Sequence, residues 1–461
     1  DLVAGNGRGD TLLVSCGACC HARLQRHSFL AGHGYTDCRG GVDDERTQLG
    51  PPPPEHWQIA DRHRVTHRRQ IDLSDNPEEL ILSSDCFFIE TDMNRDEQLA
   101  HLRLIRTPNI GPMTFSLLIQ RYGNAVEALR AVPDLARRGG RDLKPASKSA
   151  VEKELAAVEA AGATLLFKGG DGYPDRLARF DDAPPVISAR GSTSLMSSPS
   201  VAIVGARNAS INAVRLAQKL SKQLSEHGYV VVSGLARGID AAAHNGALAG
   251  GTIAVIAGGI DTYYPPENAD LQDAIIEAGL LLAEMPPGTQ PTPRHFPIRN
   301  RIIASLAQGV LVVEAAQRSG SLITAREAGE RGGEVMAIPG SPLDARAQGC
   351  NHLIREGATL VRDAEDIVEC LSRPATATLP DPQDWRAARL TPGTPAEIEK
   401  SRTRILDALG PEATDIDDVV RWCAEPVATV LAAILELELA GHISRHHGNR
   451  ICRIIDTDKA D

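Results

Sequence analysis

Aromatic residues are scarce in this chain, and long apolar runs are missing. Phe, Tyr and Trp together make up 3% of the 461 residues, with seven Phe in all. No apolar run comes near the roughly 20 residues that a membrane-spanning helix needs, because Gly and Pro interrupt the uncharged stretches. The start also lacks a basic-then-apolar leader with a cleavage site. We therefore expect neither a membrane protein nor a secreted one.

Positive charge and cysteine pairs are lacking as well. Lys and Arg number 49 against 60 Asp and Glu, a net charge of -11, which argues against non-specific coating of nucleic acid. A local basic cleft is not excluded, since phosphate binding is decided within about one Debye length, roughly 8–10 Å. The nine cysteines form no disulfide framework and indicate a reducing cytoplasm. Cys16 and Cys19 lack the second close pair typical of a zinc site, so we expect no metal and no cofactor.

Motifs that would indicate an enzyme are absent. No G-x-G-x-x-G follows the first strand of the central region, so a dinucleotide cofactor is poorly supported, and the lack of G-x-x-x-x-G-K-[ST] excludes a Walker-type ATPase. No Ser or Cys lies in a nucleophile elbow, and no pair of carboxylates is set for acid–base work. For His244, a histidine with satisfied hydrogen bonds is favoured over an acid or base. We expect ligand binding without catalysis.

The residues that are present fall into five parts. Residues 1–75 show no periodicity and are expected to be a flexible extension or a non-native start. Residues 76–165 are predicted to form a helical SAM-like domain and residues 166–372 a Rossmann-like core. A linker rich in Pro, Ala and Thr follows at residues 373–396, and residues 397–461 are predicted to form a winged helix.

The helical domain contains two helices joined by a short turn. Leu99, Leu102 and Leu104 lie at helical spacing, a turn with Gly111 follows, and the second helix is predicted to end near Gly123. The pattern resembles a helix-hairpin-helix unit, in which backbone N–H groups of the turn can meet a phosphate. The second turn glycine is absent, so an ordinary helical packing module is favoured.

Short apolar strands alternate with helices in the central core. The strands are predicted at residues 200–204, 229–232, 252–257, 280–285, 309–313 and 334–338. Uniformly apolar strands are buried on both faces, and their alternation with helices requires a parallel sheet with right-handed crossovers. The predicted fold class is therefore α/β, with a Rossmann-like doubly wound parallel sheet between a helical domain and a winged helix.

The third helix of the winged helix, predicted at residues 428–440, is unusual for a DNA-reading helix. It carries Glu436 and Glu438 and no Lys or Arg. A helix that reads the major groove should present Arg, Lys, Asn or Gln. Contact with a protein is therefore favoured over duplex binding, while Arg445 and Arg450 in the wing leave a weak contact with a DNA backbone open.

Glycine-rich corners follow four strands of the core. In an open parallel sheet, ligands bind at the carboxyl ends of the strands, where helix N-termini point outward. Such corners predict a phosphate-binding surface, although turn geometry alone would also select glycine. The predicted binding residues here are Gly205, Arg207, Ser210, Ser233, Gly234, Arg237, Gly238, Gly258, Gly259, Ser319, Gly320, Ser321 and Thr324.

A further cluster lies at residues 293–301, predicted as a loop. Three arginines, one His and the rare Phe296 occur within nine residues. An exposed ring offers a stacking face for a base, worth about 1–3 kcal/mol, while arginines take the phosphates. The alternative is a buried Phe296 and an Arg301 that pairs with Glu284 or Glu314. The predicted binding residues of this cluster are Phe296, Arg299, Asn300 and Arg301.

An ordered set of motifs runs through roughly residues 165–370. The motifs are Val204-Gly205-Ala206-Arg207, Ser233-Gly234-Leu235-Ala236-Arg237-Gly238-Ile239-Asp240-Ala241-Ala242-Ala243-His244, Tyr264-Pro265, Phe296-Pro297-Ile298-Arg299-Asn300-Arg301, Ser319-Gly320-Ser321-Leu322-Ile323-Thr324, Ile338-Pro339-Gly340 and Gly349-Cys350-Asn351-His352-Leu353-Ile354. Together they closely resemble the DNA processing protein A (DprA/Smf) family. The helical domain and the winged helix also resemble accessories found in that family.

The resemblance implies a cytoplasmic, dimeric protein that binds incoming single-stranded DNA during natural transformation and homologous recombination. It would shield the strand and load the RecA recombinase onto it. Arg207 would be the leading DNA contact, with Gly205 beside it. The residues implied to line the same groove are Arg237, Arg299, Arg301 and the turn from Ser319 to Ser321. Ala206 stands where the family usually has Thr or Ser, which removes one hydroxyl donor.

Two rival functions follow from other classes. A nucleoside-monophosphate phosphoribohydrolase would carry a glutamate in a P-G-G-x-G-T-x-x-E segment, but the comparable stretch at residues 339–342 has none. A pure scaffold would use the glycine-rich loops for structure alone and the winged helix for function.

Overall fold

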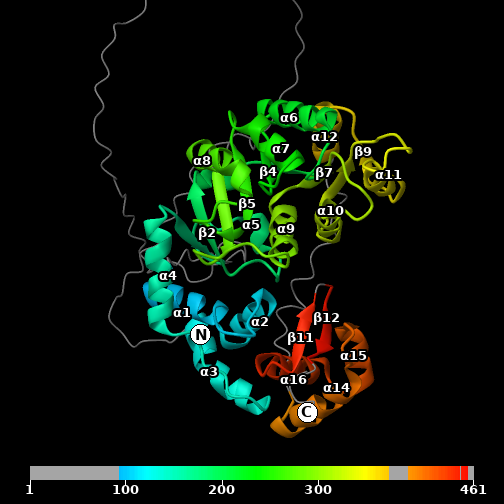
Figure 1. The fold of residues 1–461 in the computed structure, drawn as a ribbon. Coiled ribbons are helices and arrows are strands. Elements are labelled where there is room, and N and C mark those ends of the chain that lie inside the picture. The colour runs from blue at the N-terminus through cyan, green and yellow to red at the C-terminus, as the bar shows by residue number, and fades with distance from the viewer. Residues whose placement is uncertain (1–92, 373–392, 447, 455–461) are drawn as a thin grey trace, which may run out of the picture. The chain divides into compact units, whose positions relative to one another are not determined.

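The computed structural model describes residues 93–372, 393–446 and 448–454 (Figure 1). The predictions for residues 1–75 and for most of the 373–396 linker lie outside these residues. None of the helices in the described ranges is long and apolar enough to cross a membrane.

Four helices precede the core: α1 (Arg95–Ile105), α2 (Pro112–Tyr122), α3 (Ala125–Arg138) and α4 (Lys148–Ala160). Local signals set their ends. Asn94, Asn124 and Ser147 each accept a hydrogen bond from a backbone N–H of the first turn that would otherwise be unpaired. Gly123, at φ 88°, ends α2 where the sequence places the stop.

One mixed sheet forms the centre of the core, in the order β1-β2-β6-β5-β4-β3-β7-β8-β9. Neighbours from β6 to β9 run parallel, whereas β2 is antiparallel to both β6 and β1. The doubly wound sheet is therefore confirmed, with an antiparallel edge that the sequence pattern did not reveal. The strands are β1 (Thr164–Phe167), β2 (Val186–Gly191), β3 (Ser200–Val204), β4 (Val230–Ser233), β5 (Thr252–Gly259), β6 (Leu280–Met285), β7 (Gly309–Val312), β8 (Glu334–Ala337) and β9 (Thr359–Leu360).

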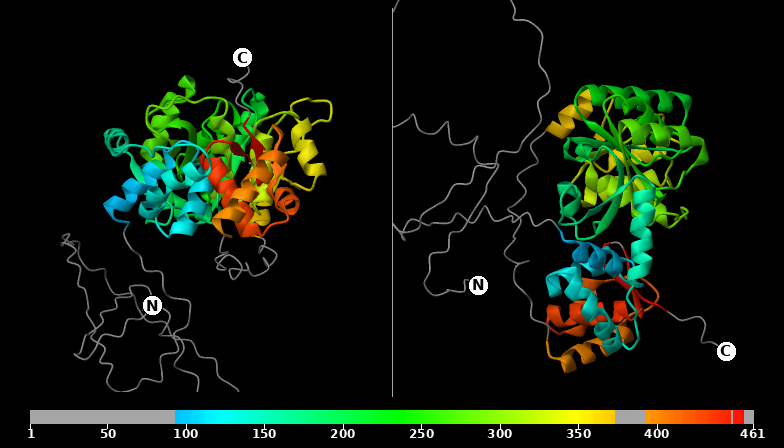
Figure 2. Two further views of the ribbon diagram at one scale, coloured as in Figure 1. Left: turned by 90° about the horizontal axis from the view of Figure 1, so that it is seen from below. Right: turned by 90° about the vertical axis from the view of Figure 1, so that its left-hand side faces the viewer.

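Helices cover both faces of this sheet (Figures 1 and 2). Alternate residues of β3 show why: Val201 and Ile203 pack toward α6, α7 and α12, whereas Ala202 and Val204 pack toward α9 and α10. The helices of the core are α5 (Asp175–Ala178), α6 (Ile211–Glu226), α7 (Ile239–Ala247), α8 (Ala269–Ala278), α9 (His295–Leu306), α10 (Ser321–Glu330), α11 (Gln348–Arg355) and α12 (Ala364–Ser372), with short 3-10 turns at η1 (Thr193–Ser197) and η2 (Pro266–Asn268).

The expected loop at residues 293–301 is wrong. Helix α9 begins at His295, so the whole Phe-Arg-Asn-Arg cluster is helical. Pro297 falls in the first turn, where the missing N–H removes no helical hydrogen bond. The helix therefore starts within the expected loop, and it fixes the spacing of Phe296, Arg299 and Arg301.

The C-terminal part is a winged helix, as predicted. A capping box between Thr394 and Glu397 starts its first helix inside the predicted linker. A short strand also joins the expected hairpin, in the order β10-β12-β11. The elements are α14 (Pro395–Ala408), β10 (Thr414–Asp415), α15 (Ile416–Cys423), α16 (Val427–Leu439), β11 (Ile443–His446) and β12 (Arg450–Arg453).

Candidate functional site

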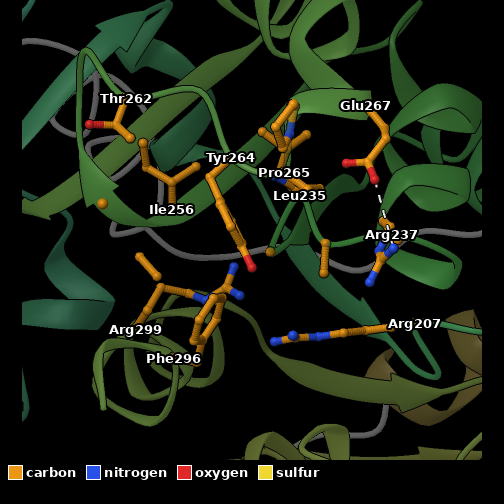
Figure 3. Close-up of a pocket in the computed structure, with 15 residues that line it drawn as sticks. Arg207, Leu235, Arg237, Ile256, Thr262, Tyr264, Pro265, Glu267, Phe296 and Arg299 are labelled. Atoms are coloured by element: carbon orange, nitrogen blue, oxygen red, sulfur yellow. Dashed lines mark ion pairs between the residues drawn. The ribbon is translucent and has the colours of Figure 1, made fainter. Parts of the chain in front are cut away.

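A pocket of about 170 Å³ lies beyond the carboxyl ends of β4 and β5, beside the loop after β3 and the first turns of α9 (Figure 3). This is the edge at which a parallel sheet presents ligand sites. The lining residues are Arg207, Gly234, Leu235, Ala236, Arg237, Ile256, Ala257, Gly258, Thr262, Tyr264, Pro265, Pro266, Glu267, Phe296 and Arg299. Six of them are predicted binding residues: Arg207, Gly234, Arg237, Gly258, Phe296 and Arg299.

The mouth of the pocket combines a cation with two rings. The Cζ atom of exposed Arg207 lies 4.6 Å from the ring centroid of half-buried Phe296. The Tyr264 ring lies 5.8 Å from the Phe296 ring, tilted by 55°. Figure 3 shows these side chains converging from segments far apart in the sequence. The guanidinium is therefore held at the surface by a cation–π contact and keeps its N–H donors available.

Arg237 occupies a second exposed position at the pocket. Its Nη1 atom lies 3.7 Å from Oε1 of Glu267, and both side chains are about three-fifths exposed, at 61% and 60%. A solvent-exposed pair at this distance contributes little to stability. An anionic ligand can therefore replace Glu267 as the partner of Arg237 at low cost.

Arg299 forms the floor of the pocket and is buried. Its Nη1 atom donates to the carbonyl oxygen of Val255 at 2.5 Å, and its Nε atom is buried with no hydrogen-bond partner among the described residues. Burial lowers the pKa of Arg299 to about 10, so the group stays charged at neutral pH. A Cβ on Gly234 would overlap this guanidinium, which explains the glycine.

Asp240 balances the buried charge from the first turn of α7. Burial raises the pKa of Asp240, while the positive charges of Arg299 and Arg207 act in the opposite direction. Its Oδ2 atom also accepts a hydrogen bond from the Ala236 N–H at 3.4 Å. The Asp240 carboxylate therefore compensates Arg299 from inside the protein, away from the exposed rim.

His244 has partners on both ring nitrogens. Its Nδ1 atom lies 2.8 Å from the Thr252 hydroxyl, and its Nε2 atom accepts the N–H of Leu235 at 3.3 Å. Because the Thr252 hydroxyl donates to Val231, we assign the proton to Nδ1. Burial lowers the pKa of His244 to about 3. The neutral ring holds the start of the 235–238 loop, as the satisfied-histidine interpretation expects.

The loop after β3 is fixed by internal contacts. The Ser210 hydroxyl caps α6 and donates to Glu314 at 2.7 Å, so this predicted residue already has strong partners. A Cβ on Gly205 would lie 2.6 Å from the Ile239 side chain. Gly238 combines a φ of 77° with close approach to the backbone of Ala206 and Arg207. These glycines and Ser210 hold Arg207 in place and lie outside the pocket lining.

Three further predicted residues lie inside the core. The Ser233 hydroxyl donates to the carbonyl oxygen of Ile203 at 2.6 Å, and its side chain is fully buried. Thr324 is 1% exposed. Gly259 packs against the 286–289 backbone, and its N–H donates to Thr289 at 2.9 Å. Gly258, in contrast, lines the pocket.

Arg301 points to a different partner. Its guanidinium lies 2.5 Å from Oε1 of Glu284 and donates to the carbonyl oxygen of Asp182, with both side chains of the ion pair largely buried. This matches the alternative in which Arg301 pairs with Glu284. Neither Arg301 nor half-buried Asn300 lines the pocket.

The turn before α10 lies at the same sheet edge outside the pocket lining, and its Ser321 side chain is buried. The Ser319 and Ser321 hydroxyls lie 2.7 Å apart, and Gly320 between them is exposed. A Cβ on Gly320 would meet no atom within 4 Å. The structure therefore divides the predicted surface into the pocket and this turn.

Sequence reasoning did not name Tyr264 among the binding residues, although Tyr264 lines the pocket. The scarcity of aromatic residues that drew attention to Phe296 applies equally to Tyr264, which follows β5.

Three family models match this chain. Residues 164–372 match the model of DNA recombination-mediator protein A. Residues 95–157 match a DprA-like N-terminal HHH domain, and residues 389–449 match a DprA winged helix domain. Together the three models cover nearly all of the described elements.

Named relatives agree with these models. The chain is 50% identical over 200 residues to DNA processing protein DprA of Streptococcus pneumoniae, which covers 43% of this chain and 71% of that protein. The X-ray structure of S. pneumoniae DprA aligns with a TM-score of 0.50 and 37% identity over 60% of this chain and 98% of that one. DNA processing protein A from Helicobacter pylori, described for its single-stranded DNA binding mode, is 28% identical over 45% of this chain and 95% of that chain, with a TM-score of 0.42.

Proposed function

Because the chain belongs to the DNA recombination-mediator protein A (DprA/Smf) family, we propose that it binds single-stranded DNA through the pocket at the carboxyl edge of its sheet. The observation that carries the proposal is the Arg207 guanidinium held over Phe296 beside Tyr264. The proposal rests on this geometry and on the family, and not on the structural likeness to the H. pylori protein.

The pocket suits a flexible polyanion. Arg207 and Arg237 supply exposed donors for phosphates, while Phe296 and Tyr264 supply ring surfaces for bases. One face of Phe296 already carries the Arg207 guanidinium, so a base takes the other face or displaces Arg207. Stacking is tolerant of base identity, because every base has a π-face. We therefore propose binding with little sequence preference.

We also propose that the site binds without chemistry. Of the residues lining the pocket, Glu267 is the one carboxylate, and it pairs with Arg237. Asp240 is buried behind Arg299. This lining offers donors for an anion and no acid–base couple of the kind that a hydrolase needs. The phosphoribohydrolase alternative has no observation in its favour.

The remaining parts of the proposal come from the family. We propose that the protein shields incoming single-stranded DNA in the cytoplasm, works as a homodimer, and loads RecA recombinase in natural transformation and recombination. No residue is assigned to the dimer or to the recombinase contact. RecA filament assembly on a fixed amount of single-stranded DNA, with and without the protein, tests the loading step.

Fluorescence anisotropy with oligo-dT and with a duplex of equal length, each at two salt concentrations, tests DNA binding. We expect tighter binding of the single strand and a steep salt dependence. Arg207→Ala should weaken single-strand binding roughly tenfold and reduce the salt slope by about 0.7, because one charged phosphate contact is lost.

Arg215→Ala is the matched control, since Arg215 is exposed on α6 and does not line the pocket. If Arg207→Ala stays within about twofold of the wild type, the site assignment is wrong. Incubation with nucleoside monophosphates, followed by an assay for released base, tests the enzyme alternative, for which we expect no product.

A further inference from the structure

Helix α16 occupies the recognition-helix position of the winged helix, but it is buried on nearly every side. Its buried residues are Thr429, Val430, Ala432, Ala433, Ile434, Leu435, Glu436, Leu437, Glu438 and Leu439, out of 13. A surface helix buries one apolar stripe, whereas a helix that is apolar all round packs against neighbours on opposite sides. Within the winged helix, α16 packs against α14, α15 and β11, and it also contacts α3 of the helical domain.

The two sides of α16 enter different hydrophobic cores. Ala433 and Leu437 pack within the winged helix, together with Ile405 of α14. Leu435 and Leu439 pack instead with residues of α1, α2 and α3, which lie within the region that matches the HHH domain. Helix α16 therefore completes the core of the helical domain as well as its own.

A glycine marks the closest approach. Gly139 follows α3, and a Cβ built there would overlap the carbonyl oxygen of Glu436 and lie 2.8 Å from the Cβ of Ala440. Its φ of −72° is open to any residue, so backbone conformation does not require glycine. The requirement comes from the α16 backbone lying against it.

The turn between α1 and α2 supplies a polar contact to the same helix. Asn109, in the left-handed region at φ 63°, donates its Nδ2 N–H to the Leu439 carbonyl oxygen at 3.2 Å. That oxygen is one of the last carbonyls of α16, which lack partners within the helix. The turn that would meet a phosphate in a helix-hairpin-helix unit instead caps α16.

The acidic residues of α16 are neutralised within the winged helix. Glu436 forms an ion pair with Arg402, and Glu438 lies 3.3 Å from Nε of Arg445. A groove-reading helix needs free donors facing outward. These carboxylates are already engaged in internal ion pairs.

We infer that the helical domain and the winged helix form one composite module joined by α16. The face of α16 that would read a duplex is covered by the helical domain, so it is not available to a DNA groove. This inference is independent of the pocket and goes beyond the proposed function.

Cleavage of the linker tests the module in the full chain. A specific protease site is placed within residues 373–392, the protein is cut, and size-exclusion chromatography follows the 393–461 fragment. We expect it to co-elute with the rest of the protein. Release of the fragment from the cut wild type at micromolar concentration would overturn the inference.

Gly139→Leu is designed to separate α16 from α3, because the leucine side chain would overlap the Glu436 backbone. We expect the cut variant to release the fragment. Gly410→Leu is the matched control, since Gly410 is exposed and a Cβ there would meet no atom within 4 Å. Equal retention of the fragment by both variants would count against the inference.

Asn109→Gly is a gentler variant should Gly139→Leu fail to fold. It keeps the positive φ and removes only the hydrogen bond to Leu439. Its fragment should dissociate several-fold faster than that of the cut wild type. An unchanged rate together with retention in the Gly139→Leu variant would overturn the proposed interface.

Discussion

The four arginines expected to hold phosphates divide into two pairs. Arg207 and Arg237 are exposed at the pocket, with a ring and a weakly held carboxylate as partners. Arg299 and Arg301 are each 5% exposed and donate to backbone carbonyl oxygens of the core. An exposed guanidinium can exchange water for a ligand, whereas a buried one has already exchanged water for the protein. Burial therefore separates ligand-binding arginines from arginines that support the fold.

The largest effect is expected at Arg301, on the buried side of the comparison. Arg301→Ala leaves the Glu284 carboxylate largely buried without its partner and should lower the free energy of unfolding by about 3–5 kcal/mol. Urea denaturation measures this change. The double variant Arg301→Met with Glu284→Gln should lose less, because it leaves no unpaired charge. A loss below about 1 kcal/mol for Arg301→Ala would place Arg301 among the exchangeable arginines.

The second largest effect is expected from acid, which should lower the free energy of unfolding through buried His244. Burial, with the positive charge of Arg299, lowers the pKa of His244 to about 3 from 6.5. The unfolded chain therefore takes up a proton below about pH 6.5 that the folded chain does not. This costs at most about 1.4 kcal/mol per pH unit, down to about pH 3. The free energy of unfolding should fall more steeply from pH 6.5 to 4.5 in the wild type than in His244→Gln. Equal slopes would contradict a neutral buried histidine.

A substitution at Gly234 tests whether the buried Arg299 guanidinium is fixed in place. Gly234→Ala places a Cβ on the Arg299 guanidinium and should cost about 1–3 kcal/mol of stability by overpacking. Gly320→Ala is the matched control at the exposed turn, where φ is −61° and nothing lies within 4 Å of the added atom. Thermal or urea unfolding of the two variants decides the case. The same loss in both would mean that Arg299 moves freely.

The smallest effect is expected at Arg237, on the exposed side. Arg237→Ala should leave stability unchanged and weaken single-strand binding about two- to fivefold, roughly 0.5–1 kcal/mol. The loss is limited because Glu267 competes with the ligand for this guanidinium. Glu267→Gln should tighten binding for the same reason. Anisotropy titrations at low salt measure both, and weaker binding by Glu267→Gln would argue against phosphate at this position.

Local patterns in the sequence were sufficient for the parallel core and the winged helix. Apolar strands such as Val230–Ser233 and stops such as Gly123 depend on neighbours along the chain. The antiparallel strands β1 and β2 were missed because only pairing with β6, far away in sequence, defines them. The start of α9 was missed, although the first turn of a helix tolerates a proline such as Pro297.

The site was harder to predict, because residue type does not encode burial. Gly234, Arg237 and Phe296 line one pocket, since the carboxyl ends of parallel strands share one edge, but their binding role stays a prediction. Ser210, Ser233 and Thr324 have the same chemistry as ligand-binding residues, yet their surroundings occupy them. Only three-dimensional neighbours, such as Glu314 for Ser210, distinguish these two outcomes.

Helix α9 carries both kinds of residue, with Phe296 in its first turn and Arg301 less than two turns later. An oligonucleotide stacked on Phe296 therefore restrains the same rigid rod that Arg301 anchors to Glu284. Ligand binding should then be visible far from the pocket mouth, as slower deuterium uptake by the backbone amides along α9. Deuterium uptake by α9 would then show whether an oligonucleotide is bound at the pocket.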